Sequence, residues 1–556
     1  MFKTMRSFWV ATLLLFATVV SAQVTTSGMS GKLTDEKKEA IIGAIVQAVH
    51  QPSGSRYATV TNTDGRFNIQ GMRPGGPYEV QIRYVGFKPK SVKNITLELG
   101  ETYNMNIIIS EDAKQMDELG VVGSSSKFAG EKTGASTNIS NAQLESMPTI
   151  SRSITDITRL SPYGGNGMNF AGVDGRTANF TVDGANFNNN FGLSDGLPGG
   201  GSPISIDAIE ELQVVISPFD VRQTNFIGGG VNAITKSGTN KFKGTAYVHH
   251  HNENMRGDVV YGQTIPGARD RDRSTTYGAT FGGPIIKDKL FFFANAEYEA
   301  SPSVAVRWRP SVDGKASEEQ YLSYTTVADM ERVQEFVKSK YGYNTGSFTD
   351  FPADESNLKL LARVDWNIND RNKLAVRYNY TKNTAWNAPN VSSMDGGERS
   401  AFGRTSLYSM PFANSMYSMN NLVHSASVDL NSRITNNLSN QLLATFSKLD
   451  DVRGSNSDEF PFIDIHDGTN TTTQYMALGY ELFTWNNAVH NTVFNIKDDI
   501  TYYTGNHKII AGISYEYQMA DNQYMRNGTG YYRYRSVDDF INGATPEVVC
   551  LTYGYD

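Results

Sequence analysis

The sequence predicts a mainly β protein with an N-terminal β-sandwich, a small α+β domain and part of a transmembrane antiparallel β-barrel. Three observations support this fold class. From residue 241 onward, strands of about ten to twelve residues alternate apolar and polar side chains. Their connections alternate between short and long. After residue 22 no run of about 18 apolar residues occurs, which excludes a spanning helix but not a barrel, whose strands are polar on average.

The charge balance and the cysteine count exclude several classes of protein. The 556 residues include 50 Lys+Arg and 57 Asp+Glu, a net charge of −7, which argues against a nucleic-acid partner. The single cysteine cannot form an intramolecular disulfide. A secreted form must therefore be held together by packing and strand pairing.

Residues 1–22 have the pattern of a secretory signal peptide. Lys3 and Arg6 give a positive start, and an apolar stretch of about 13 residues runs from Phe8 to Val20 before two small residues. The stretch is too short for a membrane span, so an uncleaved anchor or a buried helix is the less favoured alternative. We expect the mature chain to leave the cytoplasm.

Residues 23–112 contain short alternating strands separated by Gly and Pro turns, a pattern typical of a β-sandwich. Three segments, Thr63–Ile69, Pro74–Tyr78 and Tyr84–Pro89, resemble the carboxypeptidase regulatory-like domain. The resemblance implies a sandwich without catalytic residues of its own. In the Bacteroidota this module commonly precedes a TonB-dependent outer-membrane receptor, although it also decorates surface enzymes and adhesins.

Residues 113–127 form a tether with a short acidic and apolar segment, Asp117–Val122, followed by three serines after Gly123. A partner that adds a strand to its own sheet edge needs an extended segment of this kind. The segment resembles the TonB box, the peptide that TonB grips in the periplasm, and an ordinary linker is the alternative. The candidate TonB contacts are Asp117, Glu118, Leu119, Val121 and Val122.

Residues 128–240 are rich in Gly, Asn and Ser and combine short helices with strands. An acidic helix-to-strand passage over 206–215 precedes the cluster Gly228–Gly230 and the motif Val231–Gly238 (VNAITKSG). This order resembles the plug domain of TonB-dependent receptors. A finer resemblance, to the Oar-like branch, rests on Phe180–Asn189, Ser217–Arg222 and Gly282–Phe292.

The plug resemblance implies a surface that meets substrate from outside the cell. We expect this surface in a polar and aromatic plug loop, with the barrel loops 252–273 and 382–420 above it. For residues 183–190, packing within the plug is an alternative to substrate contact that the sequence favours equally. The candidate substrate-facing residues are Asn186, Phe187, Asn188, Asn189, Asn190, Phe191 and Asp195.

The barrel pattern of residues 241–556 is clearest after Leu358. Leu, Ala, Val and Trp alternate there with Lys359, Arg363 and Asp365, as expected for a strand with lipid on one side and water on the other. A soluble sandwich is the alternative. We count about a dozen strands, whereas plugs of this family fill barrels of roughly 22 strands, so we expect the N-terminal portion of a longer protein. The short connections lie near 284–288, 369–372, 431–437 and 504–507, and the long ones near 252–273, 311–356, 382–420 and 450–490.

No motif in the chain predicts catalysis. Residues 249–251 are three histidines on an expected strand, where neighbours point to opposite faces, so a structural role is favoured over a metal site. The glycine clusters lack the Lys of a phosphate loop, and Cys550 has no His partner nearby. We therefore expect no enzyme, no cofactor and no metal.

The resemblance implies a transporter in the outer membrane, with its plug and N-terminal domain on the periplasmic side. It would take up a peptide or protein, a glycan or a chelate through the plugged barrel, energised by TonB. The implied partners are TonB, outer-membrane lipid and an extracellular substrate, and a surface lipoprotein partner is left open. The alternative is an adhesin or a structural barrel that transports nothing.

Overall fold

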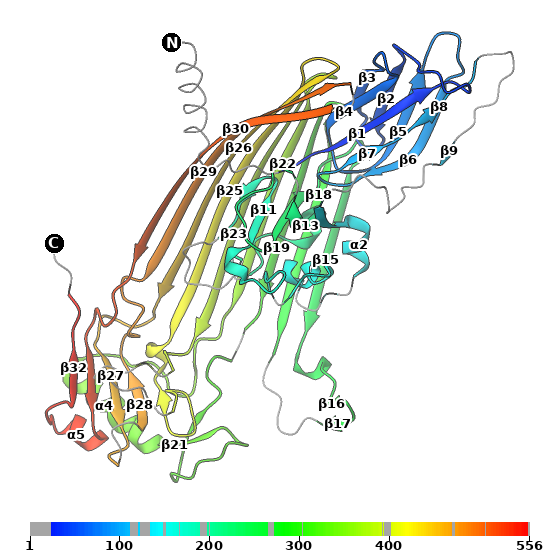
Figure 1. The fold of residues 1–556 in the computed structure, drawn as a ribbon. Coiled ribbons are helices and arrows are strands. Elements are labelled where there is room, and N and C mark those ends of the chain that lie inside the picture. Colours follow the sequence, from blue (N-terminus) through cyan, green and yellow to red (C-terminus); the bar gives the residue numbers. More distant parts are fainter. Residues whose placement is uncertain are drawn as a thin grey trace, which may run out of the picture.

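The computed structural model of the chain has four parts: a β-sandwich, a plug, a curved barrel sheet and a cap at the far end of that sheet (Figure 1). In the described residues, no helix has the length and apolar character needed to cross a membrane. The structure describes residues 24–111, 121–122, 134–147, 149, 152–165, 167–188, 197–198, 201–218, 220–264, 272–302, 304–391, 393, 402–469, 473–505 and 507–553.

The sandwich consists of two sheets that enclose one apolar core. One sheet has the order β4-β1-β7 with β8 also paired to β1, and the other has the order β3-β2-β5-β6-β9. Alternate residues such as Val46, Ala48, Val80 and Ile82 are buried between the sheets, as period-two strands require. The strands are β1 Ser27–Thr34, β2 Ile45–His50, β3 Ser55–Val60, β4 Arg66–Met72, β5 Gly75–Arg83, β6 Lys90–Leu97, β7 Thr102–Asn104, β8 Ile107–Ile108 and β9 Val121–Val122.

The plug is a five-stranded sheet of order β10-β13-β14-β11-β12 with short helices around it. Its core contains the edge-to-face pair Phe180 and Phe187, with ring centroids 6.0 Å apart. The glycine cluster lies against Phe170, because a Cβ on Gly229 would meet that ring at 2.6 Å. The elements are β10 Gly134–Ser140, α2 Asn141–Ser146, α3 Ile154–Thr158, η1 Gly175–Thr177, β11 Asn179–Val182, β12 Ala185–Asn186, η2 Ile206–Ala208, β13 Ile209–Pro218 and β14 Gly230–Thr235.

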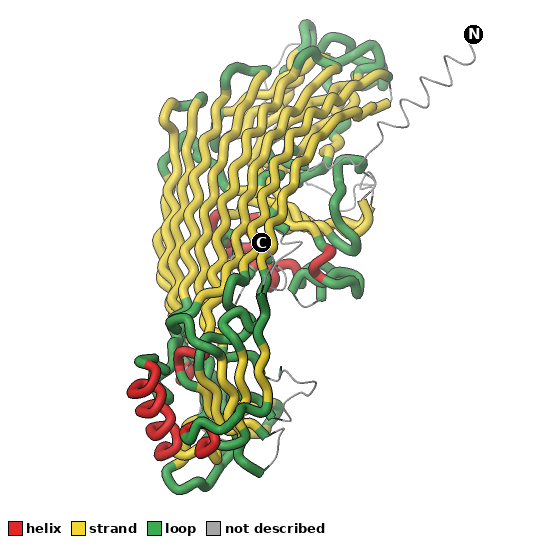
Figure 2. The backbone as a smooth tube through the Cα atoms, turned by 90° about the vertical axis from the view of Figure 1, so that its left-hand side faces the viewer, coloured by secondary structure: helices red, strands yellow, loops and turns green. Residues whose placement is uncertain are grey.

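The barrel sheet has nine antiparallel strands in the described part of the chain, and it curves around the plug (Figures 1 and 2). About a dozen strands were expected; the difference arises because several short β segments fold into the long loops. The strands are β15 Lys243–His251, β18 Ser274–Ile286, β19 Leu290–Ala300, β22 Ser356–Asn367, β23 Asn372–Asn387, β25 Tyr417–Arg433, β26 Leu438–Gly454, β29 Ala488–Thr504 and β30 His507–Gln523.

The two faces of the barrel sheet differ as the alternation predicts. On β25, Val428 points outward and is 42% exposed, whereas Ser425, Ser427 and Asp429 are buried on the inner face. The strand after Leu358 behaves in the same way, with outward apolar side chains and inward polar ones. The fold class predicted from the sequence is therefore confirmed, including a transmembrane sheet with a water-side face.

The short and long connections lie at opposite ends of the sheet, as predicted. The turns 287–289, 368–371 and 434–437 and the connection after Thr504 are at the sandwich end. At the other end, the long loops fold together into a cap with its own apolar core, which the sequence did not predict. The loop elements are η3 Glu253–Met255, β16 Val259–Val260, β17 Gln263–Thr264, β20 Arg309–Ser311, β21 Leu322–Thr326, α4 Val327–Tyr341, β24 Met410–Pro411, η4 Ala413–Ser415, β27 Phe462–His466, β28 Gln474–Leu478, β31 Tyr531–Tyr534, α5 Val537–Ile541 and β32 Val548–Cys550.

The cap is held by local signals and by one fully buried ion pair. The helix α4 begins after Thr326, whose hydroxyl accepts the N–H of Asp329, and it ends at Gly342 with φ +68°. Arg404 and Asp464 are completely buried and lie 2.6 Å apart. A buried pair of this kind fixes one arrangement of the loops, because either charge alone would be strongly unfavourable there.

Replacing Val428 with Arg tests the lipid-facing side. Val428 lies near the middle of the expected apolar band, so the charge should lower the free energy of unfolding by about 2–4 kcal/mol. Ser432→Arg, on the same face beside a short turn, should cost only about 0–1 kcal/mol. Urea unfolding of the folded protein in lipid vesicles measures both; equal costs would contradict a lipid-facing β25.

Candidate functional site: the interface between plug and barrel

The plug meets the barrel wall through the carboxylate of Asp183. This residue lies in the tight turn between β11 and β12, with φ +45°, a conformation that Asp tolerates better than most residues. The carboxylate accepts hydrogen bonds from the Thr235 N–H at 3.0 Å and its hydroxyl at 2.6 Å. On the barrel, Arg363 and Arg377 each place a guanidinium nitrogen 3.2 Å from it.

The same charge network continues into the sandwich. Arg363 and Asp365 are two residues apart on β22, so both side chains face inward, and they form an ion pair at 2.9 Å. The other partner of Asp365 is Arg73 of the sandwich, also at 2.9 Å. Arg73, Asp365, Arg363, Asp183 and Arg377 thus form one chain of opposite charges through sandwich, barrel and plug. We call these five residues the central charge network.

A second ionic cluster lies further along the wall. Glu297 and Lys359 face each other on neighbouring barrel strands at 2.8 Å and are almost fully buried. The plug hydroxyl of Ser205 donates to Glu297 at 2.8 Å, and so does the Tyr247 hydroxyl at 2.5 Å. Arg152 of the plug lies over the Tyr247 ring, 4.7 Å from its centroid. This part of the plug is therefore also attached by polar contacts.

The polar character of the interface determines what it can do. Removing one partner of a buried ion pair is costly because it leaves an uncompensated charge, whereas an intact pair adds little net stability over an apolar contact. An interface built from ion pairs and hydrogen bonds fixes the position of the plug. It can also be rewetted when the plug moves, since its groups find partners in water.

A cavity of about 730 Å³ lies where sandwich, plug and barrel meet. It borders the central charge network and has both cationic and anionic walls. The charged residues around it are Arg73, Glu145, Asp183, Glu210, Lys236, Lys243, Arg363, Asp365, Lys373, Arg377 and Asp429.

Glu211 on β13 joins the plug to the sandwich. Its carboxylate accepts the Leu99 N–H at 2.8 Å and the Asn138 side-chain amide at 2.9 Å, while Gln213 donates to the Leu99 carbonyl at 2.7 Å. Burial raises the pKa of Glu211 to about 7, although the two hydrogen bonds act in the opposite direction. This contact between the two domains therefore contains a carboxyl group that titrates near neutral pH.

Comparison with known proteins agrees with this architecture. Residues 28–110 match the family model of the carboxypeptidase regulatory-like domain, and residues 234–308 and 321–548 match that of the outer membrane beta barrel domain. The chain belongs to the outer membrane beta barrel domain family. The protein is therefore located in the outer membrane.

Two curated relatives of this outer membrane barrel are similar over parts of their length. The TonB-dependent transporter Oar of Myxococcus xanthus is 25% identical over 302 residues, which cover 51% of this chain and 28% of Oar. The TonB-dependent receptor P3 of Formosa agariphila is 24% identical over 149 residues, which cover 27% of this chain and 14% of that receptor. The chain thus spans less than a third of the length of these relatives.

Solved structures also resemble the barrel. The outer membrane transporter YddB from Escherichia coli matches with a TM-score of 0.49 and 14% identity, covering 72% of this chain and 50% of YddB. The siderophore receptor PirA from Acinetobacter baumannii matches with a TM-score of 0.41 and 14% identity, covering 69% and 47% of the two chains.

The predicted substrate-facing residues of this barrel protein lie in different environments. Phe187 is fully buried in the plug core, where its ring packs against Phe180, and its contact with substrate stays a prediction. Asn188 also packs within the plug, because its side chain accepts the Phe180 N–H at 2.7 Å. Asn186 accepts the N–H of Asn188, and its contact with substrate stays a prediction. Asn189, Asn190, Phe191 and Asp195 lie outside the described residues.

Most of the predicted TonB contacts are likewise outside the described residues, namely Asp117, Glu118 and Leu119, as is the signal peptide 1–22. Val121 and Val122 form β9, whose backbone pairs in parallel with Val92 and Lys93 of β6. The three histidines have separate partners: His249 contacts Arg152 at 3.1 Å, His250 contacts Thr275 at 2.8 Å, and His251 lies 3.7 Å from the Asp272 carboxylate.

The sequence did not identify Asp183, Arg73 or Glu211 as contact residues. The inward position of Arg363 and Asp365 was readable from the alternation, and two opposite charges on a lumen-facing strand predict charged partners inside the barrel. The identity of those partners depends on the docking of plug and sandwich, which has no local signal in the sequence.

Replacing Asp183 with Asn should loosen the plug. The change leaves the guanidinium of Arg377 without its carboxylate partner, and losing one member of a buried pair costs about 3–5 kcal/mol. The matched control is Asp174→Asn at the plug surface, where Asn caps η1 as well as Asp does. Trypsin cleavage of the plug at increasing urea concentration measures the difference; equal midpoints for both variants would contradict the role of Asp183.

Replacing Glu211 with Gln should remove a pH dependence. The pKa of Glu211 is raised in the folded protein, so its contribution to stability is complete below the unfolded value of about 4.5 and is lost as pH rises through about 7. The plug of the unaltered protein should therefore resist unfolding better at pH 5 than at pH 8.5. Gln keeps the hydrogen-bond acceptor without the charge, so the difference should shrink in urea titrations at the two pH values; an unchanged difference would assign it to another group.

Proposed function

We propose that the full-length protein takes up a substrate across the outer membrane and that TonB energises this uptake through the tether 113–127. The observation that carries the proposal is a separately folded plug attached to the barrel wall by buried polar contacts, above all by Asp183. The partial similarity to the TonB-dependent transporter Oar supports it. The proposal assigns no catalysis to the chain.

The position of the plug strands supports a mechanical route. The first plug strand, β10, is the edge strand of its sheet and pairs only with β13 among the described strands. Along the chain the tether 113–127 precedes β10, whose pairing begins at Gly134. Traction on the tether therefore reaches an edge strand first, where few hydrogen bonds must break at a time. It then reaches β13, which carries Glu211.

The proposed TonB contact is strand addition. TonB would take the segment from Asp117 to Val122 into its own sheet, where backbone hydrogen bonds provide the grip. On the cell surface, the cap and the plug would bind the substrate. Its class is a peptide or protein, a glycan or a chelate, and a surface lipoprotein would be an additional partner at the cap.

Deleting Asp117–Val122 from the full-length protein in its native membrane tests the proposal. We expect unchanged abundance in the outer membrane and loss of growth on one class of nutrient: peptides, glycans or iron chelates. The reason is that the barrel and plug still fold, whereas TonB has no segment to grip. Growth and uptake on the three classes of nutrient are the measurements.

A pair of proline variants is a sharper control. Leu119→Pro removes a backbone donor within the proposed strand, whereas Ser125→Pro makes the same change in the serine stretch outside it. Leu119→Pro should reproduce the deletion and Ser125→Pro should not. Unchanged growth of the deletion strain on every nutrient, together with lost surface attachment when the whole protein is removed, would favour the adhesin instead.

A further inference from the structure

The sandwich forms one wall of the cavity between plug and barrel. The network residue Arg73 lies at this boundary, and on the plug side the cavity is lined by Lys236 and Ser237. A molecule that leaves the barrel between the plug and the inner wall through this cavity meets the sandwich. The sandwich residues that line the cavity include Thr25, Pro52, Tyr57, Gly71 and Arg73.

The sandwich is attached to the barrel rim by side chains at several points. Besides the ion pair of Arg73 with Asp365, the side-chain amide of Asn367 donates to the Ser55 hydroxyl at 2.9 Å. The Thr25 hydroxyl donates to Asp429 at 2.5 Å. These contacts come from different strands and turns of the sandwich, so they fix its orientation as well as its position.

The sandwich is also attached to the plug. Arg73 donates to the Ser237 hydroxyl at 2.5 Å, the Asn240 N–H donates to the Pro52 carbonyl at 2.8 Å, and Leu99 contacts Glu211. The backbone carbonyl of Arg73 accepts the Tyr78 hydroxyl at 2.7 Å, which holds the turn that presents Arg73. One rigid domain thus bridges the seam between the plug and the barrel.

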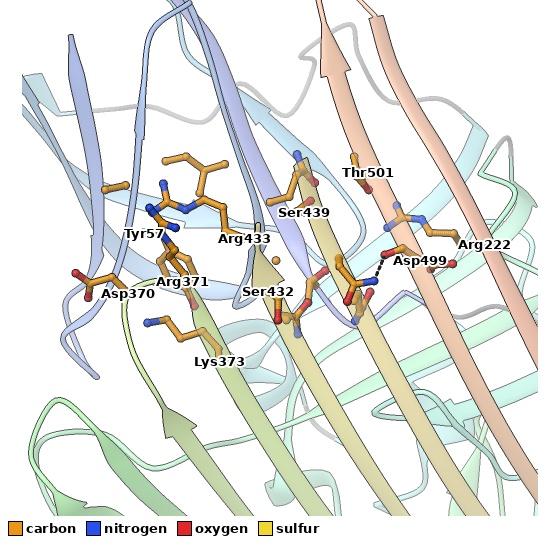
Figure 3. A pocket seen from close by; sticks show the side chains of 18 residues that line it. Tyr57, Arg222, Asp370, Arg371, Lys373, Ser432, Arg433, Ser439, Asp499 and Thr501 are labelled. Atoms are coloured by element: carbon orange, nitrogen blue, oxygen red, sulfur yellow. Dashed lines mark hydrogen bonds between the residues drawn. The ribbon is translucent and has the colours of Figure 1, made fainter. Parts of the chain in front are cut away.

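The contact at the rim is polar and mostly buried. A small pocket of about 40 Å³ lies at this contact. Figure 3 shows Lys373, Arg371 and Arg433 of the barrel rim near Tyr57 of the sandwich. The ammonium of Lys373 lies 5.6 Å from the centroid of the Tyr57 ring. Polar contacts between domains resemble transient interfaces, which open and close without exposing a large apolar surface.

We propose that the sandwich is a lid over the exit cavity and that it must undock from the barrel rim before cargo can leave. The proposal rests on the proposed function and adds a second gate to it. The described part of the sandwich ends at residue 111 and the plug begins at Gly134, so the tether joins the two. Traction between them acts on lid and plug together, and Arg73 is the residue whose contacts both movements must break.

Docking of the lid is tested by chemical labelling of the full-length protein in detergent. In a background without other cysteines, which includes Cys550→Ser, Asn431→Cys places a thiol in the cavity wall beneath Gly71. Arg73→Glu puts a carboxylate beside Asp365, so fluorescein maleimide should label the thiol at least fivefold faster. Arg83→Glu makes the same charge change on β5, at an exposed residue whose hydrogen bond is to Gln81 within the sandwich, and should leave the rate unchanged. Equal rates for Arg73→Glu and its parent would overturn the lid.

The need to undock is tested by a reversible lock. Ser55→Cys with Asn367→Cys, in the same background without other cysteines, joins two side chains that already touch. We expect oxidation to reduce uptake at least tenfold and reduction to restore it. The control pair Thr384→Cys and Asn420→Cys joins two neighbouring barrel strands at a similar side-chain distance, 3.0 Å, and should transport in both states.

The two proposals fail in different ways. The nutrient used in the lock experiment is the one that the deletion of Asp117–Val122 identifies. If that deletion affects no nutrient, the transport proposal fails, while the labelling rates still report whether the sandwich covers the cavity. If transport is confirmed and the oxidised lock transports as fast as the reduced one, the sandwich is not a gate.

Discussion

The buried contact between Asp183 and the barrel arginines is the constraint on which the arrangement of this protein depends. A carboxylate in the plug and two guanidinium groups on the wall are each costly to bury alone, and together they are tolerated only in one geometry. The tight turn at Asp183 provides that geometry, because it brings the carboxylate to the end of the plug sheet where Thr235 also holds it. The plug therefore has one defined position against the barrel wall.

The alternation of the barrel strands explains why the contact surface between plug and barrel is charged. A strand that presents apolar residues to lipid presents its other residues to the lumen, and these face either water or the plug. Some inward positions break the pattern, and they do so where the plug core reaches the wall: Leu361 and Val423 are inward, apolar and buried within that core. Polar contacts orient the plug, and a small apolar contact closes the space behind it.

The sequence predicted the parts of the fold that follow from local pattern. The period-two strands, the end of the sheet that carries the short turns, and the sandwich are local properties, and all three are present. The assembly of the long loops into a cap was not predictable, because its core residues, such as Met330 and Ile465, come from loops that are far apart in the chain. The alternation around Leu358 was predictable, whereas the apolar side chains at inward positions, such as Leu361, were not.

The candidate site was predictable only in part for the same reason. The motif around Phe187 identified a plug loop, but the resemblance does not indicate which of its side chains point into the plug core, and Phe187 is one that does. The charges on β22 were visible at inward positions, yet their partners Asp183 and Arg73 are about 180 and 290 residues away along the chain. Long-range docking decides such contacts, and a strand pattern contains no information about it.

The tether joins two domains that are docked to each other, and this connection determines how the lid would respond to a pull. A sandwich attached only to the barrel would leave the plug free to move alone, and one attached only to the plug would move with it as a single body. Arg73 contacts both Asp365 of the barrel and Ser237 of the plug, so movement of either the sandwich or the plug breaks a contact of Arg73. The cost of opening is then shared among many weak polar contacts, each replaceable by water, and a pull that breaks them in sequence meets a smaller barrier than one that must break them at once.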